Sequence, residues 1–161
     1  MRADRHLHNP LWDYAAEVYE HDGVATACLA LQDRFGVDVN LLLYAAWLAK
    51  LRRRLTAAHL QALEAAIADW REEVVRPLRA LRRQIRTTPG AGDVYDGLKA
   101  LEMRAERVQL DAMHAFHLQA GALPATLDGL RDNLQVVTDS VAASHADLEA
   151  ALDALVARLQ V

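Results

Sequence analysis

Several features that define other classes of protein are scarce in this sequence. Cys28 is the single cysteine among 161 residues, which excludes an intrachain disulfide and a cysteine-based zinc cluster. There are only 7 glycines and 4 prolines, while alanine and leucine are abundant. Such a composition favours helix and argues against sheet, collagen and disorder.

Long hydrophobic runs are also missing. The longest apolar run covers residues 41–49, whereas a helix that spans a bilayer needs about 20 apolar residues. The first ten residues carry charges with no hydrophobic stretch after them, which does not fit a signal peptide. We therefore expect a soluble, cytoplasmic protein without a membrane span, of a size that suits a single domain.

Apolar residues recur at helical spacing, and no segment alternates as a β-strand does. The sequence therefore predicts an all-α fold, with three helices at residues 10–20, 24–35 and 39–54. We expect residues 9–55 to form a compact subdomain within a single helical domain over residues 9–161. Residues 1–8 are predicted to be a disordered tail.

The rest of the chain is predicted to form long antiparallel helices of a bundle. Residues 56–120 are expected to form a helical hairpin kinked at Pro77, with a loop at the Pro- and Gly-rich residues 87–92. Its second helix carries a heptad stripe: Val94, Leu98, Leu101, Ala105, Val108, Ala112 and Ala115.

Residues 125–161 are predicted to form a C-terminal amphipathic element of one helix or two. Its apolar stripe either packs on the chain's own bundle or forms a coiled coil with a second copy, giving a homodimer. The residues of this stripe are Leu148, Leu152, Leu155 and Leu159.

The net charge of -4 is unevenly distributed. Residues 51–86 contain 9 arginines against 4 acids, while residues 87–161 are acidic. Within the basic stretch, steps of three and four place arginines on one helical face: Arg76, Arg79, Arg83 and Arg86, with Arg82 beside them. This face either pairs with the chain's acidic helices, binds an acidic protein partner, or contacts RNA or the ribosome. The acidic net charge and the lack of interleaved aromatic residues argue against nucleic acid.

A second candidate site surrounds the turn at Gly36. Polar side chains there lie in strongly apolar surroundings, together with nearby aromatic residues: Trp12, Gln32, Asp33, Asp38, Asn40, Tyr44 and Trp47. They are interpreted either as helix caps and turn-stabilising groups, or as the lining of a small-ligand or enzymatic pocket.

Recognisable catalytic or cofactor motifs are missing. The glycines Gly90 and Gly92 follow a helix and not a strand, so they do not predict a phosphate-binding loop. Asp111 and His114 give a single Asp-x-x-His, whereas a ferritin-like di-iron site needs such a pair on each of two helices. Cys28 lies on an apolar helix face, which predicts a buried, inert thiol. We therefore assign no catalytic residue, no metal and no cofactor.

Four segments resemble a proteobacterial, all-helical family of conserved proteins of unknown function. They are residues 11–14 (LWDY), 28–33 (CLALQD), 36–43 (GVDVNLLL) and 75–83 (VRPLRALRR). The resemblance covers about residues 10–118 and implies a bacterial cytoplasmic protein, but no reaction. Together these observations favour a non-enzymatic helical adaptor that binds an acidic protein surface through the arginine face.

Overall fold

The computed structural model describes residues 9–160 and is all-α over that range, as the sequence predicts. The only β-type pairing within these residues is an isolated bridge between Arg53 and Ala125. The expected tail, residues 1–8, lies outside the described residues. The elements are α1 (Pro10–Tyr19), α2 (Val24–Phe35), α3 (Val39–Lys50), α4 (Ala57–Trp70), the π-helical turn η1 (Arg71–Val75), α5 (Arg76–Ile85), α6 (Gly92–Gln119), α7 (Leu130–Asp139) and α8 (Ala146–Leu159).

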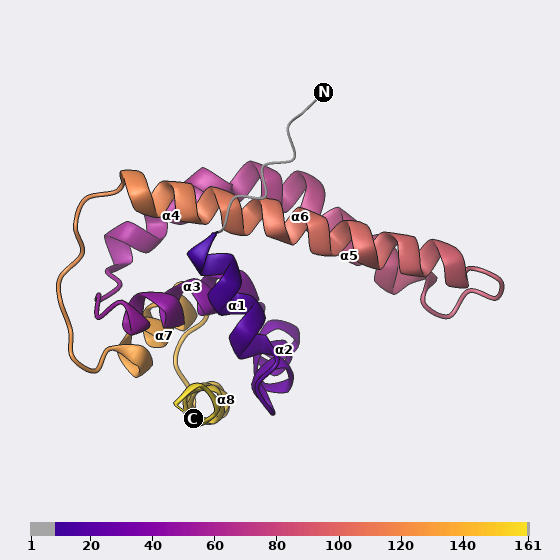
Figure 1. The fold of residues 1–161 in the computed structure, drawn as a ribbon. Coiled ribbons are helices and arrows are strands. Elements are labelled where there is room, and N and C mark those ends of the chain that lie inside the picture. The colour runs from indigo at the N-terminus through magenta and orange to yellow at the C-terminus, as the bar shows by residue number, and fades with distance from the viewer. Residues whose placement is uncertain (1–8, 161) are drawn as a thin grey trace. The chain divides into compact units, whose positions relative to one another are not determined.

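The chain divides into two compact units. The first combines the residues up to Gln61 with those from Ala120 onward, and the second is Ala62–Gln119. In the first unit, α7 packs on α3 and α8 packs on α2. In the second, α6 runs back along η1 and α5 (Figure 1). The C-terminal element is therefore two helices, and the single-domain organisation stays a prediction.

Helix α3 is the centre of the first unit. Its residues from Asn40 to Leu48 are all buried, which agrees with a sequence that is apolar nearly all round. The helix ends at Lys50 and not at residue 54 as predicted. The reason is local: the backbone of Arg52 is left-handed, with φ 57, which an α-helix does not tolerate.

A buried asparagine on α7 holds the end of α3 in place. The side chain of Asn133 is fully buried, and its Oδ1 accepts the N–H of Leu55 at 2.8 Å. Its Nδ2 donates to the carbonyls of Ala45 (3.2 Å) and Arg53 (2.9 Å). One side chain thus bonds three main-chain groups where the chain leaves α3, among them the buried N–H of Leu55.

We expect Asn133→Ala to lower the free energy of unfolding by roughly 2–4 kcal/mol, because it leaves the buried Leu55 N–H unsatisfied and removes two further hydrogen bonds. Chemical denaturation of the full chain measures this change. The neighbouring exposed residue provides the control, and Asp132→Ala should stay within about 0.5 kcal/mol of wild type. Equal stability of the two variants would contradict the role assigned to Asn133.

A second polar contact in this unit joins Tyr44 on α3 to His59 on α4. The Tyr44 hydroxyl and His59 Nε2 lie 2.7 Å apart, and the two rings stack with an interplanar angle of 6°. Burial lowers the pKa of His59 below its ordinary 6.5, because the interior disfavours the charged imidazolium. The folded state therefore prefers a neutral His59.

A lowered pKa means that the unfolded chain binds more protons than the folded chain as the pH falls through 6.5. His59 therefore contributes stability above that pH, and the contribution is lost on acidification. We expect the melting temperature to fall between pH 7 and pH 5, and His59→Gln to reduce that slope. An unchanged slope in the variant, measured by thermal unfolding, would refute this role.

The second unit begins as one helical rod with an irregular turn. Pro77 has no N–H to donate to the carbonyl four residues earlier, so a regular α-helix is interrupted at this point. The interruption takes the form of the π-helical turn η1, directly before α5. The backbone at Arg76 is again helical, with φ -63 and ψ -44. The structure thus shows a π turn shortly before Pro77, and the kink predicted at Pro77 stays a prediction.

Candidate functional site

Two residues of the turn around Gly36 are helix caps. Asp38 caps α3, and its carboxylate accepts the N–H of Asn40 at 2.8 Å. Gly36 ends α2 with φ 70, in the left-handed conformation that glycine adopts without strain. The structural interpretation of this segment is therefore observed directly for Asp38 and Gly36.

The other residues of the predicted pocket lie in different environments. Tyr44 is fully buried and Trp47 is 5% exposed, both within the core around α3. Trp12 and Gln32 are half-buried, while Asp33 is exposed. A ligand pocket formed by this set stays a prediction, and none of its members lines the cavity that the structure does contain between α2 and α8.

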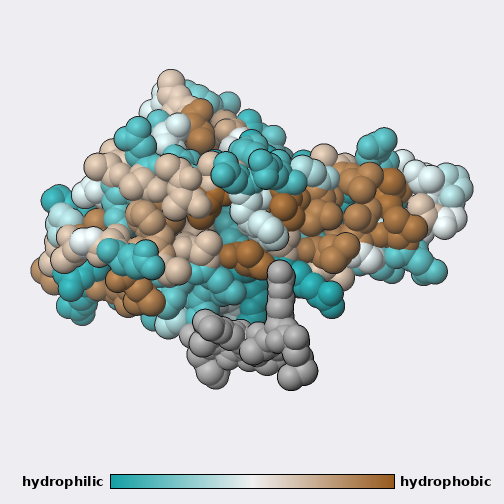
Figure 2. Space-filling view, turned by 90° about the horizontal axis from the view of Figure 1, so that it is seen from above, coloured by the Kyte–Doolittle hydropathy of each residue, from teal (hydrophilic) through white to brown (hydrophobic). Residues whose placement is uncertain are grey.

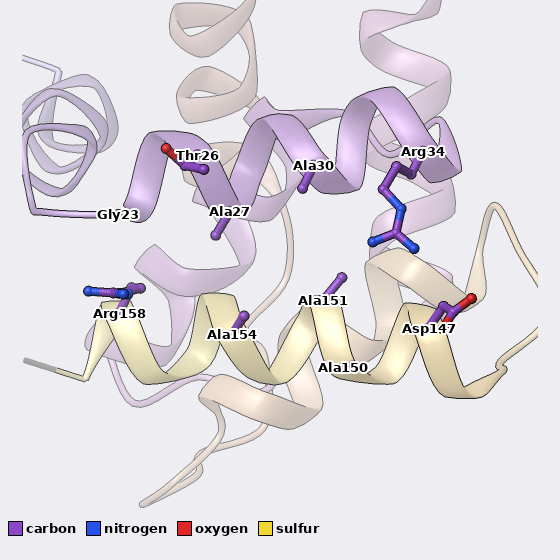
Figure 3. A pocket seen from close by; sticks show the side chains of 10 residues that line it. All are labelled: Gly23, Thr26, Ala27, Ala30, Arg34, Asp147, Ala150, Ala151, Ala154 and Arg158. Carbon is purple, nitrogen blue, oxygen red and sulfur yellow. The ribbon is translucent and has the colours of Figure 1, made fainter.

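That cavity is a shallow groove of about 600 Å³ between α2 and α8, lined mainly by alanines (Figure 3). Arg34 of α2 points toward α8 at one end, near Asp147, and Arg158 lies at the other end beside Gly23. A Cβ on Gly23 would lie 2.8 Å from Arg158 Nε. Small residues thus let the two helices approach closely, and polar groups occur only at the two ends of the groove.

The leucine stripe of α8 is used within the chain. Leu148, Leu152 and Leu155 are all 0% exposed, and α8 packs against α2 and α7. Of the two alternatives for this stripe, packing on the chain's own helices is the one observed. These three side chains are not available for a coiled coil with a second copy, and Leu159 is half-buried at the end of the helix.

The arginine face of α5 is divided between two roles. Arg79 and Arg82 turn toward α6, where both bind the carboxylate of Glu102. Arg79 Nε lies 3.1 Å from one Glu102 oxygen, and its Nη2 lies 2.7 Å from Glu106. Arg82 donates to both Glu102 oxygens. The acidic helix thus neutralises this part of the basic stretch.

Glu102 is a buried charge that is compensated on both sides. Burial alone would favour the neutral acid, but hydrogen bonds from Arg82 and Arg79 and their positive charges outweigh it. The pKa of Glu102 therefore lies below its ordinary value, and the residue is ionised at neutral pH. A carboxylate with two guanidinium partners resists separation, because removing one partner leaves a buried charge uncompensated.

The remaining arginines of the face are exposed. Arg76, Arg83 and Arg86 all have exposed side chains, and Arg76 lies 3.1 Å from Glu72 one turn earlier. Helical spacing places Arg83 nearly opposite Leu81 around α5. The structure therefore leaves a basic edge of three arginines on the outward side of the hairpin.

The Glu102 cluster sets which side of α6 is covered. Because Glu102 and Gln109 face inward and are buried, much of the heptad stripe lies beside the contact with α5, although its Ala105 is buried as well. Its Val94, Leu101 and Val108 are 59%, 49% and 46% exposed, and Leu81 of α5 is 46% exposed. We call these four residues the apolar face. Figure 2 shows apolar surface along this part of the hairpin.

We expect Glu102→Gln to destabilise the second unit by about 2–4 kcal/mol, because Arg82 then loses its charged partner. Hydrogen exchange of α5 and α6 amides reports this unit directly. Glu73→Gln is the control, since Glu73 is an exposed carboxylate of the same hairpin, on η1. Equal protection of the α6 amides in wild type and Glu102→Gln would show that the cluster does not hold the hairpin.

Within residues 9–160, no three His, Cys, Asp or Glu side chains gather as a metal site would require. Cys28 is 0% exposed, as predicted, and burial raises the pKa of its thiol to about 12. No helix in this part of the chain is both long and apolar enough to cross a membrane.

Comparison with known proteins places the chain in a family without assigning a reaction. No curated protein and no solved structure matches the sequence. The family described as "Protein of unknown function (DUF2390)" matches residues 10–113, which include the first three helices, the arginine-bearing α5 and most of α6. Since this match covers more than half of the chain, the protein belongs to the DUF2390 family.

Proposed function

We propose that this chain is a helical interaction protein that works by binding and not by catalysis. The surface that supports this proposal best is the basic edge of α5, formed by Arg76, Arg83 and Arg86. The observation that carries it is the division of the arginine face: Arg79 and Arg82 turn inward to α6, while the side chains of these three are exposed to solvent.

The local charge supports an acidic partner. No acidic residue occurs between Glu73 and Asp93, so the whole of α5 and the following loop carry only positive charge. Guanidinium groups bind carboxylates through paired hydrogen bonds, which makes arginine well suited to an acidic protein surface. The rigid hairpin also presents these side chains at fixed helical spacing, which reduces the ordering cost of binding.

The first experiment identifies the partner. The purified full chain is immobilised, proteins retained from a bacterial lysate are named by mass spectrometry, and the strongest candidate is purified for affinity measurement. We expect an acidic protein whose affinity falls between 0.05 M and 0.5 M salt, because exposed charge pairs are screened. Loss of the retained material after nuclease treatment would point to nucleic acid and overturn the proposal.

The second experiment locates the surface. We expect Arg83→Glu combined with Arg86→Glu to raise the Kd for the purified partner by about ten-fold, since several exposed charge contacts change from attraction to repulsion. Arg52→Glu combined with Arg54→Glu changes the charge equally at exposed residues outside the hairpin and should change the Kd less than about two-fold. Equal Kd values for the two double variants would refute this assignment.

A further inference from the structure

The apolar face of the hairpin is the strongest feature that the proposed function leaves unused. The contact between α5 and α6 is partly ionic, through Glu102, and leaves apolar side chains of both helices exposed. The apolar stripe of α6 extends from Val94 to Ala115, about 33 Å along the helix. Trp70 lies beside it, 36% exposed, with its indole N–H donated to the Ala105 carbonyl at 2.8 Å.

The sequence of the stripe determines what could cover it. In heptad positions, d is Val94, Leu101, Val108 and Ala115, and a is Leu98, Ala105 and Ala112. The g positions, which lie beside the stripe on the side away from α5, are Gly97, Arg104, Asp111 and Leu118. An a/d stripe with these flanking residues is typical of a helix that packs on another helix of the same kind.

We propose that α6 packs antiparallel on α6 of a second copy of this chain, around a two-fold axis between residues 106 and 107. Each α5 then lies on the outer side of its own α6, and the two hairpins form a four-helix bundle. This inference concerns the face of the hairpin opposite to the basic edge of α5. It therefore does not depend on the acidic partner proposed above.

Residue sizes match in this pairing. In antiparallel coiled coils, a positions of one helix pack against d positions of the other. With the two-fold axis between residues 106 and 107, the a and d residues that pack together have numbers that sum to 213. Leu98 then faces Ala115 of the second copy, and Leu101 faces Ala112. The central layers join Val108 to Ala105, which is only 5% exposed in the single chain. Each larger side chain thus meets an alanine, so the layers can interdigitate at close helix separation.

Charge selects this register over its neighbours. The g positions of the two helices lie on the same side of this pairing, offset by about 3 Å from the a and d layers. In the proposed register the g residue nearest to Arg104 is therefore Asp111 of the second copy, twice by symmetry. Sliding one helix by one heptad brings Arg104 against Arg104 in one direction and Asp111 against Asp111 in the other. Like charges at such positions are unfavourable. The stripe is therefore electrostatically complementary to itself in one register.

The other two g positions fit the same register. Leu118, 70% exposed, faces Gly97 of the second copy. Glycine within a helix costs about 1 kcal/mol relative to alanine, and nothing lies within 4 Å of the position that a Cβ on Gly97 would take. A leucine from the second copy would fill that open space. This pairing gives both the mid-helix glycine and the exposed leucine a role.

The oligomeric state of the purified full chain tests the proposal. Sedimentation velocity from about 1 to 100 µM should show a dimer, and Arg104→Asp and Asp111→Arg should each raise the dimer Kd by about ten-fold, because two attractive contacts become repulsive. The double variant should restore the wild-type Kd, since the charges are exchanged but still opposite. An equimolar mixture of the two single variants should form heterodimers.

A second pair of variants tests the apolar contact. Leu101→Glu should abolish the dimer while circular dichroism shows unchanged helicity, because residue 101 is exposed in the single chain. Leu127→Glu, at a residue that is 89% exposed outside the hairpin, is the matched control and should dimerise as wild type does. A monomer at about 100 µM, a dimer unaffected by Leu101→Glu, or a charge-exchanged double variant no better than the singles would each overturn the proposal.

Discussion

The burial of one carboxylate, that of Glu102, determines how the second unit is built. Glu102 is 6% exposed between two guanidinium groups of α5, and a buried charge tolerates few other orientations. With Glu102 directed at α5, helical geometry turns the a/d stripe of α6 about a quarter turn away from the contact. The exposure of Val94, Leu101 and Val108 follows from this constraint, while Ala105 of the same stripe stays buried.

The first unit uses a neutral group in a comparable way. Apolar burial around α3 supplies most of the favourable free energy, but apolar contacts are weakly directional and specify helix position poorly. Asn133 adds the directional component, because its three hydrogen bonds fix the segment from Ala45 to Leu55 against α7. In both units a buried polar side chain therefore specifies the arrangement that hydrophobic packing stabilises.

The sequence predicts the features that depend on neighbouring residues. Asn9 and Pro10 begin α1 as expected, with the Asn9 side chain accepting two main-chain N–H groups, and Asp38 begins α3. These caps can be predicted from the sequence because the capping residue and the residues whose N–H groups it accepts lie within three positions of each other. The roles of Asn133 and Glu102 cannot be predicted in this way. The hydrogen-bond partners of Asn133 lie 78 to 88 residues away in the sequence, and the arginine partners of Glu102 lie 20 to 23 residues away. In the sequence, Glu102 is one acid among many, and its position next to the a/d stripe does not by itself distinguish an inward from an outward orientation.

The same distinction explains why the arginine face was predicted as a unit but is divided in the structure. Spacing shows that Arg76, Arg79 and Arg83 share one side of a helix, but a helix side is wide enough to border both a neighbouring helix and solvent. Only the position of α6 decides which arginines are neutralised. Once Arg79 and Arg82 are bound to Glu102, the hairpin has two chemically different faces, one apolar and one basic, on opposite sides. Because the two faces share no residue, occupation of the apolar face by one partner leaves the basic face accessible to another.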